Sequence, residues 1–268
     1  MYKKSIDLKS IVRLIKTPLA ARKCILYLNA TLKTIDDKTI ITINKYGVSF
    51  YVNTYSDLYC ILEVFYLTLY KINFNYNAIV IDIGLNIGTA AVFFAQNKNI
   101  EHIYAFEPFK ETYEQAESNL NLNKALKDKI TIYNYGLSGK DETKNALYSS
   151  KMTIYMSVLS ENQKNFVSKK DMSYCTVVLK SADKEISDII YNTKRKIILK
   201  MDCEGSEYEI FDSLNRSGVL KRIDYIMLEW HNKGPNYILD RLKENGFTSF
   251  ALSAVNPICG TIYAVRER

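Results

Sequence analysis

The feature that most constrains the fold is an apolar segment that leads directly into a glycine-containing turn. Residues 78–83 are almost wholly apolar and β-branched, which is typical of a strand buried on both faces of a parallel sheet. Gly84 and Gly88 follow, and glycine permits a tight turn and a close approach of the backbone to a ligand. A helix is expected to begin after Gly88, and its free N–H groups favour a nucleoside-containing ligand.

Strand and helix patterns alternate after this turn, which predicts a doubly wound α/β sheet with helices on both faces. The sequence predicts helices near residues 88–96, 110–122, 182–191, 206–214 and 237–245, and strands near residues 102–106, 130–133, 153–159, 175–179, 196–201, 225–230, 248–252 and 261–265.

The length of 268 residues and the hydrophobic content of 47% favour one main domain with additions. Residues 1–77 are interpreted as an N-terminal helical and β-hairpin extension, with a hairpin at residues 39–52 and a helix at residues 57–70 capped by Ser56. Residues 78–268 form the predicted main domain. Within it, the less regular residues 139–195 are interpreted as an insertion that contacts a substrate.

Composition excludes several classes of protein. The five cysteines are scattered and only two histidines are present, which supports neither a disulfide framework nor a structural zinc site and favours a reducing, cytoplasmic setting. The longest apolar run, residues 58–70, is interrupted by Glu63 and is too short to span a bilayer. No secretory signal is recognised.

The net charge of +7 is concentrated near the N-terminus, because residues 1–23 contain seven Lys or Arg and one Asp. Leu8, Ile11, Val12 and Ile15 are spaced as on one face of a helix. Such a basic amphipathic helix either contacts the inner face of a membrane or packs on its own domain, and the second interpretation is favoured. Nucleic-acid binding is not expected, since the basic residues do not continue as a stripe.

A second motif supports a nucleoside ligand. Glu107 ends the strand that follows the glycine turn, about twenty residues after it, where an acid accepts hydrogen bonds from ribose hydroxyls. Asn86 replaces the middle glycine of a dinucleotide-binding fingerprint. An NAD-dependent oxidoreductase is therefore a distant alternative, and no Tyr-x-x-x-Lys pair is recognised.

The ordered motifs at residues 80–88, 106–108, 200–207 and 228–231 resemble those of the FkbM-type methyltransferases, and the resemblance extends from about residue 38 to the C-terminus. It implies a Rossmann-like class I fold that binds S-adenosylmethionine, with a seven-stranded, mostly parallel sheet whose last strand is antiparallel. It also implies O-methylation of a sugar, glycan or related hydroxyl, as in polysaccharide biosynthesis. Leu85, Cys203 and Ser206 depart from the usual family residues.

The resemblance also implies which residues bind the cofactor. The glycine turn would line its methionine part, Glu107 would hold its ribose, and residues 134–137 would flank its adenine. Asp202 and Glu204 are expected in the same crevice, at the carboxyl end of the central strand beside the first strand. The predicted cofactor-binding residues are Asp82, Gly84, Asn86, Gly88, Glu107, Asn134, Gly136, Asp202 and Glu204.

The catalytic candidates are His231, Glu229 and Asp202. An alcohol must lose its proton during methyl transfer, and a positioned carboxylate or imidazole can accept it. The same three residues could instead hold a divalent metal ion such as magnesium, manganese or zinc, which would lower the pKa of the acceptor. A non-enzyme alternative is an inactive methyltransferase-fold subunit of a glycan-assembly complex that reaches a membrane through the basic N-terminus.

Overall fold

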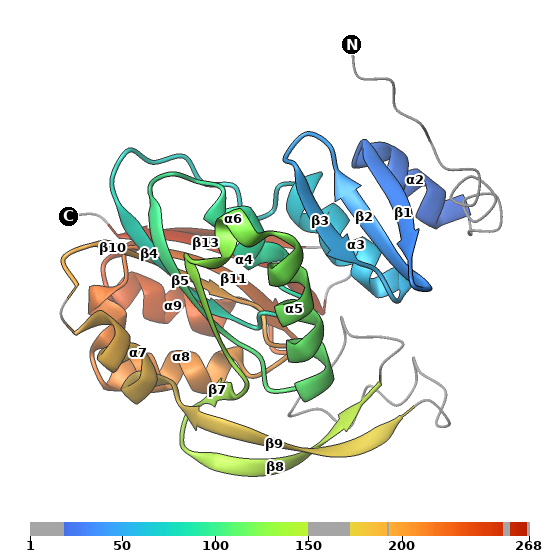
Figure 1. The fold of residues 1–268 in the computed structure, drawn as a ribbon. Helices are drawn as coiled ribbons and strands as arrows, with labels where there is room; N and C mark the ends of the chain where they lie inside the picture. The colour runs from blue at the N-terminus through green and yellow to red at the C-terminus, as the bar shows by residue number, and fades with distance from the viewer. Residues whose placement is uncertain (1–18, 150–171, 192, 254–257, 267–268) are drawn as a thin grey trace.

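The computed structural model describes residues 19–149, 172–191, 193–253 and 258–266. A seven-stranded sheet forms its centre, with the strand order β12-β13-β11-β10-β4-β5-β6 (Figure 1). The strands of this sheet are β4 (Ala78–Ile83), β5 (Ile100–Phe106), β6 (Ile130–Tyr133), β10 (Lys196–Met201), β11 (Tyr225–His231), β12 (Phe247–Ser253) and β13 (Cys259–Arg266).

Neighbouring strands from β11 through β10, β4 and β5 to β6 are parallel. β13 is antiparallel to both β11 and β12. The predicted mostly parallel sheet with an antiparallel last strand is therefore confirmed. Every residue of β4 is buried, in agreement with its apolar sequence.

Helices cover both faces of the sheet. Successive residues of a strand point to opposite faces, so neighbouring residues of β4 pack against different helices. Val80 packs in the cluster that contains α4 and α5, whereas Ile81 packs with α7, α8 and α9 (Figure 1). The helical elements of this region are α4 (Thr89–Ala95), α5 (Lys110–Leu122), α6 (Lys124–Lys127), α7 (Ala182–Ile190), α8 (Glu207–Arg216), the 3-10 helix η4 (Val219–Arg222) and α9 (Asn236–Glu244).

The N-terminal extension packs against the α4 and α5 side of the main sheet. It consists of α2 (Leu19–Tyr27), α3 (Tyr55–Phe65) and a sheet of β1 (Ala30–Ile35), β2 (Lys38–Ile43) and β3 (Val48–Tyr51). The Asn119 side chain of α5 accepts a hydrogen bond from Tyr51 N, and Asn123 bonds both N and O of Ser49. These amides join β3 to α5, so the extension shares a core with the main domain.

The predicted hairpin is confirmed as β2 and β3, but α2 and β1 were not predicted. The prediction for α3 was wrong at both ends, because the helix begins at Tyr55 and ends at Phe65. Its cap is Thr54 rather than Ser56. Thr54 and Asp57 form a reciprocal capping box, in which each side chain bonds the backbone N–H of the other.

A third sheet contains β7 (Gly136–Ser138), β8 (Glu142–Tyr148) and β9 (Ser173–Ser181), in the order β7-β9-β8. The β8 and β9 ribbon lies beside the main sheet in Figure 1. β9 leads directly into α7, which packs on the main sheet, so residues 139–195 include a helix of the main fold. The predicted strand near residues 153–159 and the amphipathic segment with Leu8 to Ile15 lie outside the described residues.

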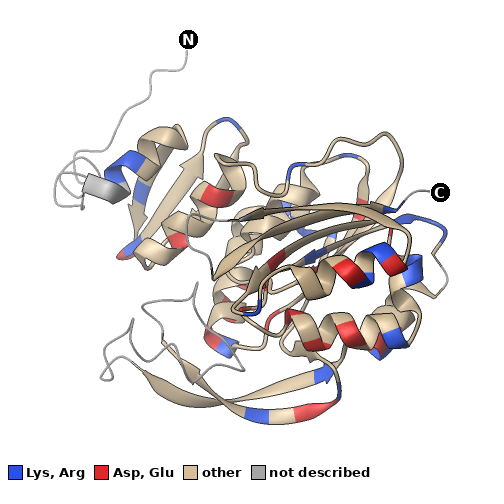
Figure 2. Ribbon diagram, turned by 180° about the vertical axis from the view of Figure 1, so that it is seen from behind, with Lys and Arg blue, Asp and Glu red and all other residues tan. Residues whose placement is uncertain are grey.

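α9 carries acidic and basic side chains close together, whereas α8 carries acidic side chains and ends in Arg216 (Figure 2). No helix in the described ranges is both long and apolar enough to cross a membrane.

Candidate active site

The glycine turn after β4 lies against the end of β10. Gly84 has a φ of +86°, and a Cβ placed on it would lie 1.8 Å from the carbonyl oxygen of Asp202. Asn86 and Gly88 also have positive φ values, of 51° and 88°. This left-handed backbone turns the chain sharply into α4. Leu85, a departure from the family pattern, is 1% exposed and packs in the core.

Glu107 lies beside this turn, as the sequence predicts. Its carboxylate accepts hydrogen bonds from Asn86 N at 2.9 Å and from Phe109 N at 3.1 Å. Burial raises the pKa of Glu107 to about 7, although the two backbone hydrogen bonds act in the opposite direction. The buried carboxylate therefore connects the glycine turn to the start of α5.

Asn134 and Gly136, which were predicted to flank the adenine, contact other residues of the protein. The Asn134 amide donates a hydrogen bond to the carbonyl oxygen of Glu107 at 3.1 Å. Gly136 packs so tightly that a Cβ there would lie 2.7 Å from the Leu179 side chain. The contacts place both residues beside β5 and β9, and their roles in adenine binding stay predictions.

Asp82 lies beneath the turn in an ion pair that the sequence did not reveal. Its Oδ1 atom is 2.9 Å from Lys200 Nζ, and the side chains are 0% and 4% exposed. Lys200 Nζ also donates a hydrogen bond to the carbonyl oxygen of Gly84 at 2.5 Å. The structure thus gives Asp82 a contact that holds the turn to β10, and direct contact with a cofactor stays a prediction.

The ends of β10 and β11 bring together an acid–imidazole cluster, made up of Asp202, Glu204, Glu229 and His231. His231 Nε2 lies 3.6 Å from a Glu204 oxygen and 3.8 Å from a Glu229 oxygen. Donor atoms of Asp202, Glu229 and His231 all lie within 4.8 Å of one another. The three residues predicted as catalytic, or as metal ligands, are therefore neighbours.

Two groups of the acid–imidazole cluster, His231 and Glu229, have raised pKa values and keep their protons at neutral pH. Burial lowers the pKa of His231, but its hydrogen bond to Glu207 and the nearby carboxylates raise the value to about 10. Burial, followed by the charge of Asp202, raises the pKa of Glu229 to about 8. At neutral pH, His231 is therefore an imidazolium, and Glu229 is largely protonated.

Glu207 is a site residue that the sequence reasoning did not select. It belongs to the first turn of α8, is fully buried, and accepts a hydrogen bond from His231 Nδ1 at 2.9 Å. The sequence could have pointed to Glu207, because it lies in the same motif as Asp202 and Glu204.

The N-terminal extension supplies a second group of residues that the sequence reasoning did not select. Tyr70 donates a hydrogen bond to Asp202 Oδ2 at 3.4 Å, and Asn86 bonds Cys60 Sγ at 3.6 Å. Burial and the charge of Asp202 raise the pKa of Glu63 to about 7. The available signal was that Glu63 interrupts an otherwise apolar run. These contacts make α3 and the segment after it one wall of the site.

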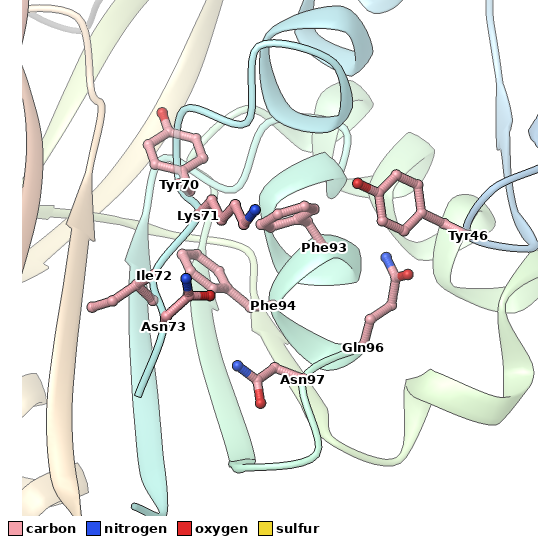
Figure 3. A pocket seen from close by; sticks show the side chains of 9 residues that line it. All are labelled: Tyr46, Tyr70, Lys71, Ile72, Asn73, Phe93, Phe94, Gln96 and Asn97. Atoms are coloured by element: carbon pink, nitrogen blue, oxygen red, sulfur yellow. The ribbon is translucent and has the colours of Figure 1, made fainter. Parts of the chain in front are cut away.

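A pocket of about 250 Å³ lies on the other side of Tyr70, between the segment after α3 and the end of α4. Figure 3 shows the Tyr70 hydroxyl pointing away from Asn73, Phe94 and Asn97, which line this pocket. Tyr70 thus separates the pocket from the acid–imidazole cluster.

The donor set around the glycine turn fits S-adenosylmethionine. The Glu107 carboxylate suits two neighbouring ribose hydroxyls. The half-buried Asp202 carboxylate suits a cation carrying an ammonium and a sulfonium group. The same edge of the sheet is where open α/β folds bind ligands. The residues present therefore suit the charge and the hydrogen-bonding groups of this cofactor.

The chain was compared with protein families, curated proteins and solved structures. The family model described as the methyltransferase FkbM domain matches residues 82–249, which is more than half of the chain. No curated protein matches the sequence.

Solved structures that are similar in fold include a methyltransferase FkbM from Methylobacillus flagellatus KT, with 14% identity and a TM-score of 0.47 over 77% of this chain and 53% of that chain. The chain thus spans about half the length of that protein. Precorrin-6y C5,15-methyltransferase from Geobacter metallireducens GS-15 gives 12% identity and a TM-score of 0.40, covering 75% and 86%. Streptococcus pneumoniae Sp1610 in complex with S-adenosyl-L-methionine gives 14% identity and a TM-score of 0.39, covering 72% and 67%.

Proposed function

The chain belongs to the FkbM family of methyltransferases, and we propose that it transfers the methyl group of S-adenosylmethionine to a hydroxyl oxygen of a sugar, glycan or related small molecule. The observation that carries the proposal is the position of the acid–imidazole cluster. It lies next to the glycine turn, because Asp202 touches Gly84 and belongs to the cluster at the same time.

The cofactor side of the proposal uses the turn and Glu107. Gly84, Asn86 and Gly88 form a close-fitting backbone surface, and Glu107 accepts hydrogen bonds from the ribose. The sulfonium of the bound cofactor supplies an activated methyl group. The protein therefore has to align the acceptor oxygen, exclude water and receive one proton.

We assign proton acceptance to Asp202. Glu229 and His231 hold their own protons at neutral pH, with pKa values of about 8 and about 10, so they are poor proton acceptors there. Both can instead donate hydrogen bonds that orient the acceptor oxygen. The Tyr70 hydroxyl, which donates to Asp202 Oδ2, fixes the direction of the Asp202 carboxylate.

A polyhydroxylated acceptor is supported by the number of carboxyl groups around the cluster. Glu63 and Glu204 add further hydrogen-bonding groups from α3 and from the turn after β10. A sugar offers several hydroxyls to such a set, whereas an aromatic acceptor offers few. This agrees with the glycan acceptors that the family resemblance implies. It also supports a role in polysaccharide biosynthesis, without contact to nucleic acid.

Calorimetric titration with S-adenosylmethionine and S-adenosylhomocysteine tests the cofactor assignment, with NAD as the control. We expect the adenosyl compounds to bind and NAD not to bind. Transfer of radiolabelled methyl groups to a panel of monosaccharides and oligosaccharides then tests the acceptor class. Asp202→Asn should abolish transfer. His231→Asn should reduce transfer strongly while leaving S-adenosylhomocysteine affinity within about threefold, because no cofactor contact is proposed for the His231 side chain.

The alternatives give different results. Binding of none of the nucleotides supports an inactive methyltransferase-fold scaffold, and binding of NAD alone supports an oxidoreductase. Labelling of nitrogen or carbon acceptors in place of hydroxyls would reject O-methyl transfer while retaining the cofactor assignment.

A further inference from the structure

The buried carboxylate of Glu207 makes three hydrogen bonds through one oxygen atom. Its Oε1 atom accepts from His231 Nδ1 at 2.9 Å, from Cys203 N at 3.2 Å and from Gly205 N at 3.1 Å. The side chain is 0% exposed. Its second oxygen, Oε2, has no hydrogen-bond partner among the described residues.

These bonds join two elements that carry the acid–imidazole cluster. Cys203 and Gly205 belong to the turn after β10, in which Glu204 and Gly205 have positive φ values of 55° and 112°. His231 is the last residue of β11. A left-handed turn with a non-glycine residue is unfavourable by itself and persists only when its surroundings hold it. Glu207 supplies two of the hydrogen bonds that hold this turn.

The hydrogen bond between Glu207 and His231 Nδ1 also sets the orientation of the imidazole ring. When Nδ1 donates to a carboxylate, the ring orientation is fixed and Nε2 is the nitrogen left for other partners. Here Nε2 points to the side on which Glu204 and Glu229 lie, at 3.6 and 3.8 Å.

We propose that Glu207 is the positioning residue of this site: it fixes the His231 ring with Nε2 toward the acceptor and holds the turn that carries Asp202 and Glu204. The inference rests on the proposed function, since it assigns His231 a part in orienting the acceptor. Glu207 itself lies behind His231 and touches no reacting atom.

Glu207→Gln is the informative variant because it is nearly isosteric. Its amide oxygen can keep the place of Oε1 and all three hydrogen bonds, and its amino group takes the place of Oε2, which has no partner. The fold should therefore be retained while the negative charge is lost. Glu209→Gln, in the same turn of α8, is the matched control.

Nuclear magnetic resonance reports the contact without any assay of activity. The chain has two histidines, so His102→Gln leaves His231 as the single imidazole. In this background we expect a strongly downfield Nδ1 proton, as found for an imidazole bonded to a carboxylate. It should move upfield or disappear in Glu207→Gln and stay unchanged in Glu209→Gln.

Kinetics with the acceptor found in the carbohydrate panel give the second readout. Glu207→Gln removes the negative charge beside the imidazole and should lower kcat by ~10- to 100-fold, the range typical when the outer-shell partner of a metal-ligating histidine is mutated. KM and S-adenosylhomocysteine affinity should change by less than about twofold. Glu207→Asp, which keeps the charge on a shorter side chain, should recover part of kcat.

An unchanged Nδ1 resonance together with full kcat in Glu207→Gln would overturn the inference. Loss of cofactor affinity and of thermal stability with an unchanged resonance would overturn it as well, because this is the pattern of a structural residue. Absence of methyl transfer in the wild-type protein would contradict the proposed function instead, and the resonance would still test the contact between Glu207 and His231.

Discussion

The ammonium group of Lys200 lies 2.9 Å from a carboxylate oxygen of Asp82, and both side chains are almost completely shielded from solvent. The two residues face each other across the paired strands β10 and β4, where they are register partners. Lys200 also bonds the carbonyl oxygen of Gly84. One buried ion pair therefore supports the turn on which the proposed cofactor site is built.

Removing one partner of the Lys200–Asp82 ion pair should lower the stability of the protein. Lys200→Met leaves the Asp82 carboxyl buried without its counter-charge, and we expect a loss of about 3–5 kcal/mol in the free energy of unfolding, measured by urea denaturation. Lys110→Met, which removes one partner of the exposed Lys110–Glu114 pair, should cause little change. A cost for Lys200→Met as small as that of the control would show that the pair does not hold the turn.

The Glu107 carboxylate should matter for cofactor affinity. Glu107→Ala removes the acceptor of Asn86 N and Phe109 N together with the proposed ribose contact. We expect S-adenosylhomocysteine affinity to fall by ~10- to 100-fold, as is common for a charged hydrogen-bond partner. Glu101→Ala, at the opposite end of the same strand, is the calorimetric control. Equal affinities in the two variants would reject the ribose assignment.

The ligand-free protein should lose stability as the pH rises from about 5.5 to 8.5. Glu107 and Glu63 have pKa values of about 7 in the folded state, raised from 4.5. Between these values the folded state binds more protons than the unfolded state, so the free energy of unfolding falls as the pH rises. His231 acts in the same direction between pH 6.5 and about 10. His102, whose pKa burial lowers, acts weakly in the opposite direction.

Urea denaturation at pH 5.5, 7.0 and 8.5 measures this dependence, to which each of the two carboxyl groups should contribute a decrease on the order of 2 kcal/mol. Glu63→Gln should flatten the curve, because the variant has no carboxyl group at this position. Stability that rises over the same range would contradict the assigned protonation states.

Methyl transfer should not depend on a divalent metal ion at pH 7. Asp202, Glu229 and His231 have the spacing of metal ligands, but a metal would have to displace the proton of His231, whose pKa is about 10. At pH 7 this competition weakens binding through the imidazole by about 10³-fold. EDTA-treated protein should therefore keep its rate. Loss of activity with EDTA and recovery with manganese would assign the three residues to a metal site.

Local patterns were sufficient for the central fold. The β-branched run of β4 and the alternation after it predict a buried parallel sheet, because a strand enclosed by helices on both faces must be apolar throughout. The bounds of β4, α5, β6 and β10 agree with the structure residue by residue. The end of α3 could not be predicted in this way, since the apolar pattern continues to Tyr70 after the helix has ended at Phe65.

The sequence by itself determined which side chains end the strands, and so placed Glu107, Asp202, Glu229 and His231 at one edge of the sheet. Only the tertiary structure decided that Lys200 pairs with Asp82, that Glu207 bonds His231, and that Glu63 and Tyr70 form a wall of the site. The reason is physical. The repeat of apolar residues along a strand or helix shows which face each side chain lies on. Contacts between elements depend instead on strand order and on how the extension packs, and neither produces a repeating pattern in the sequence.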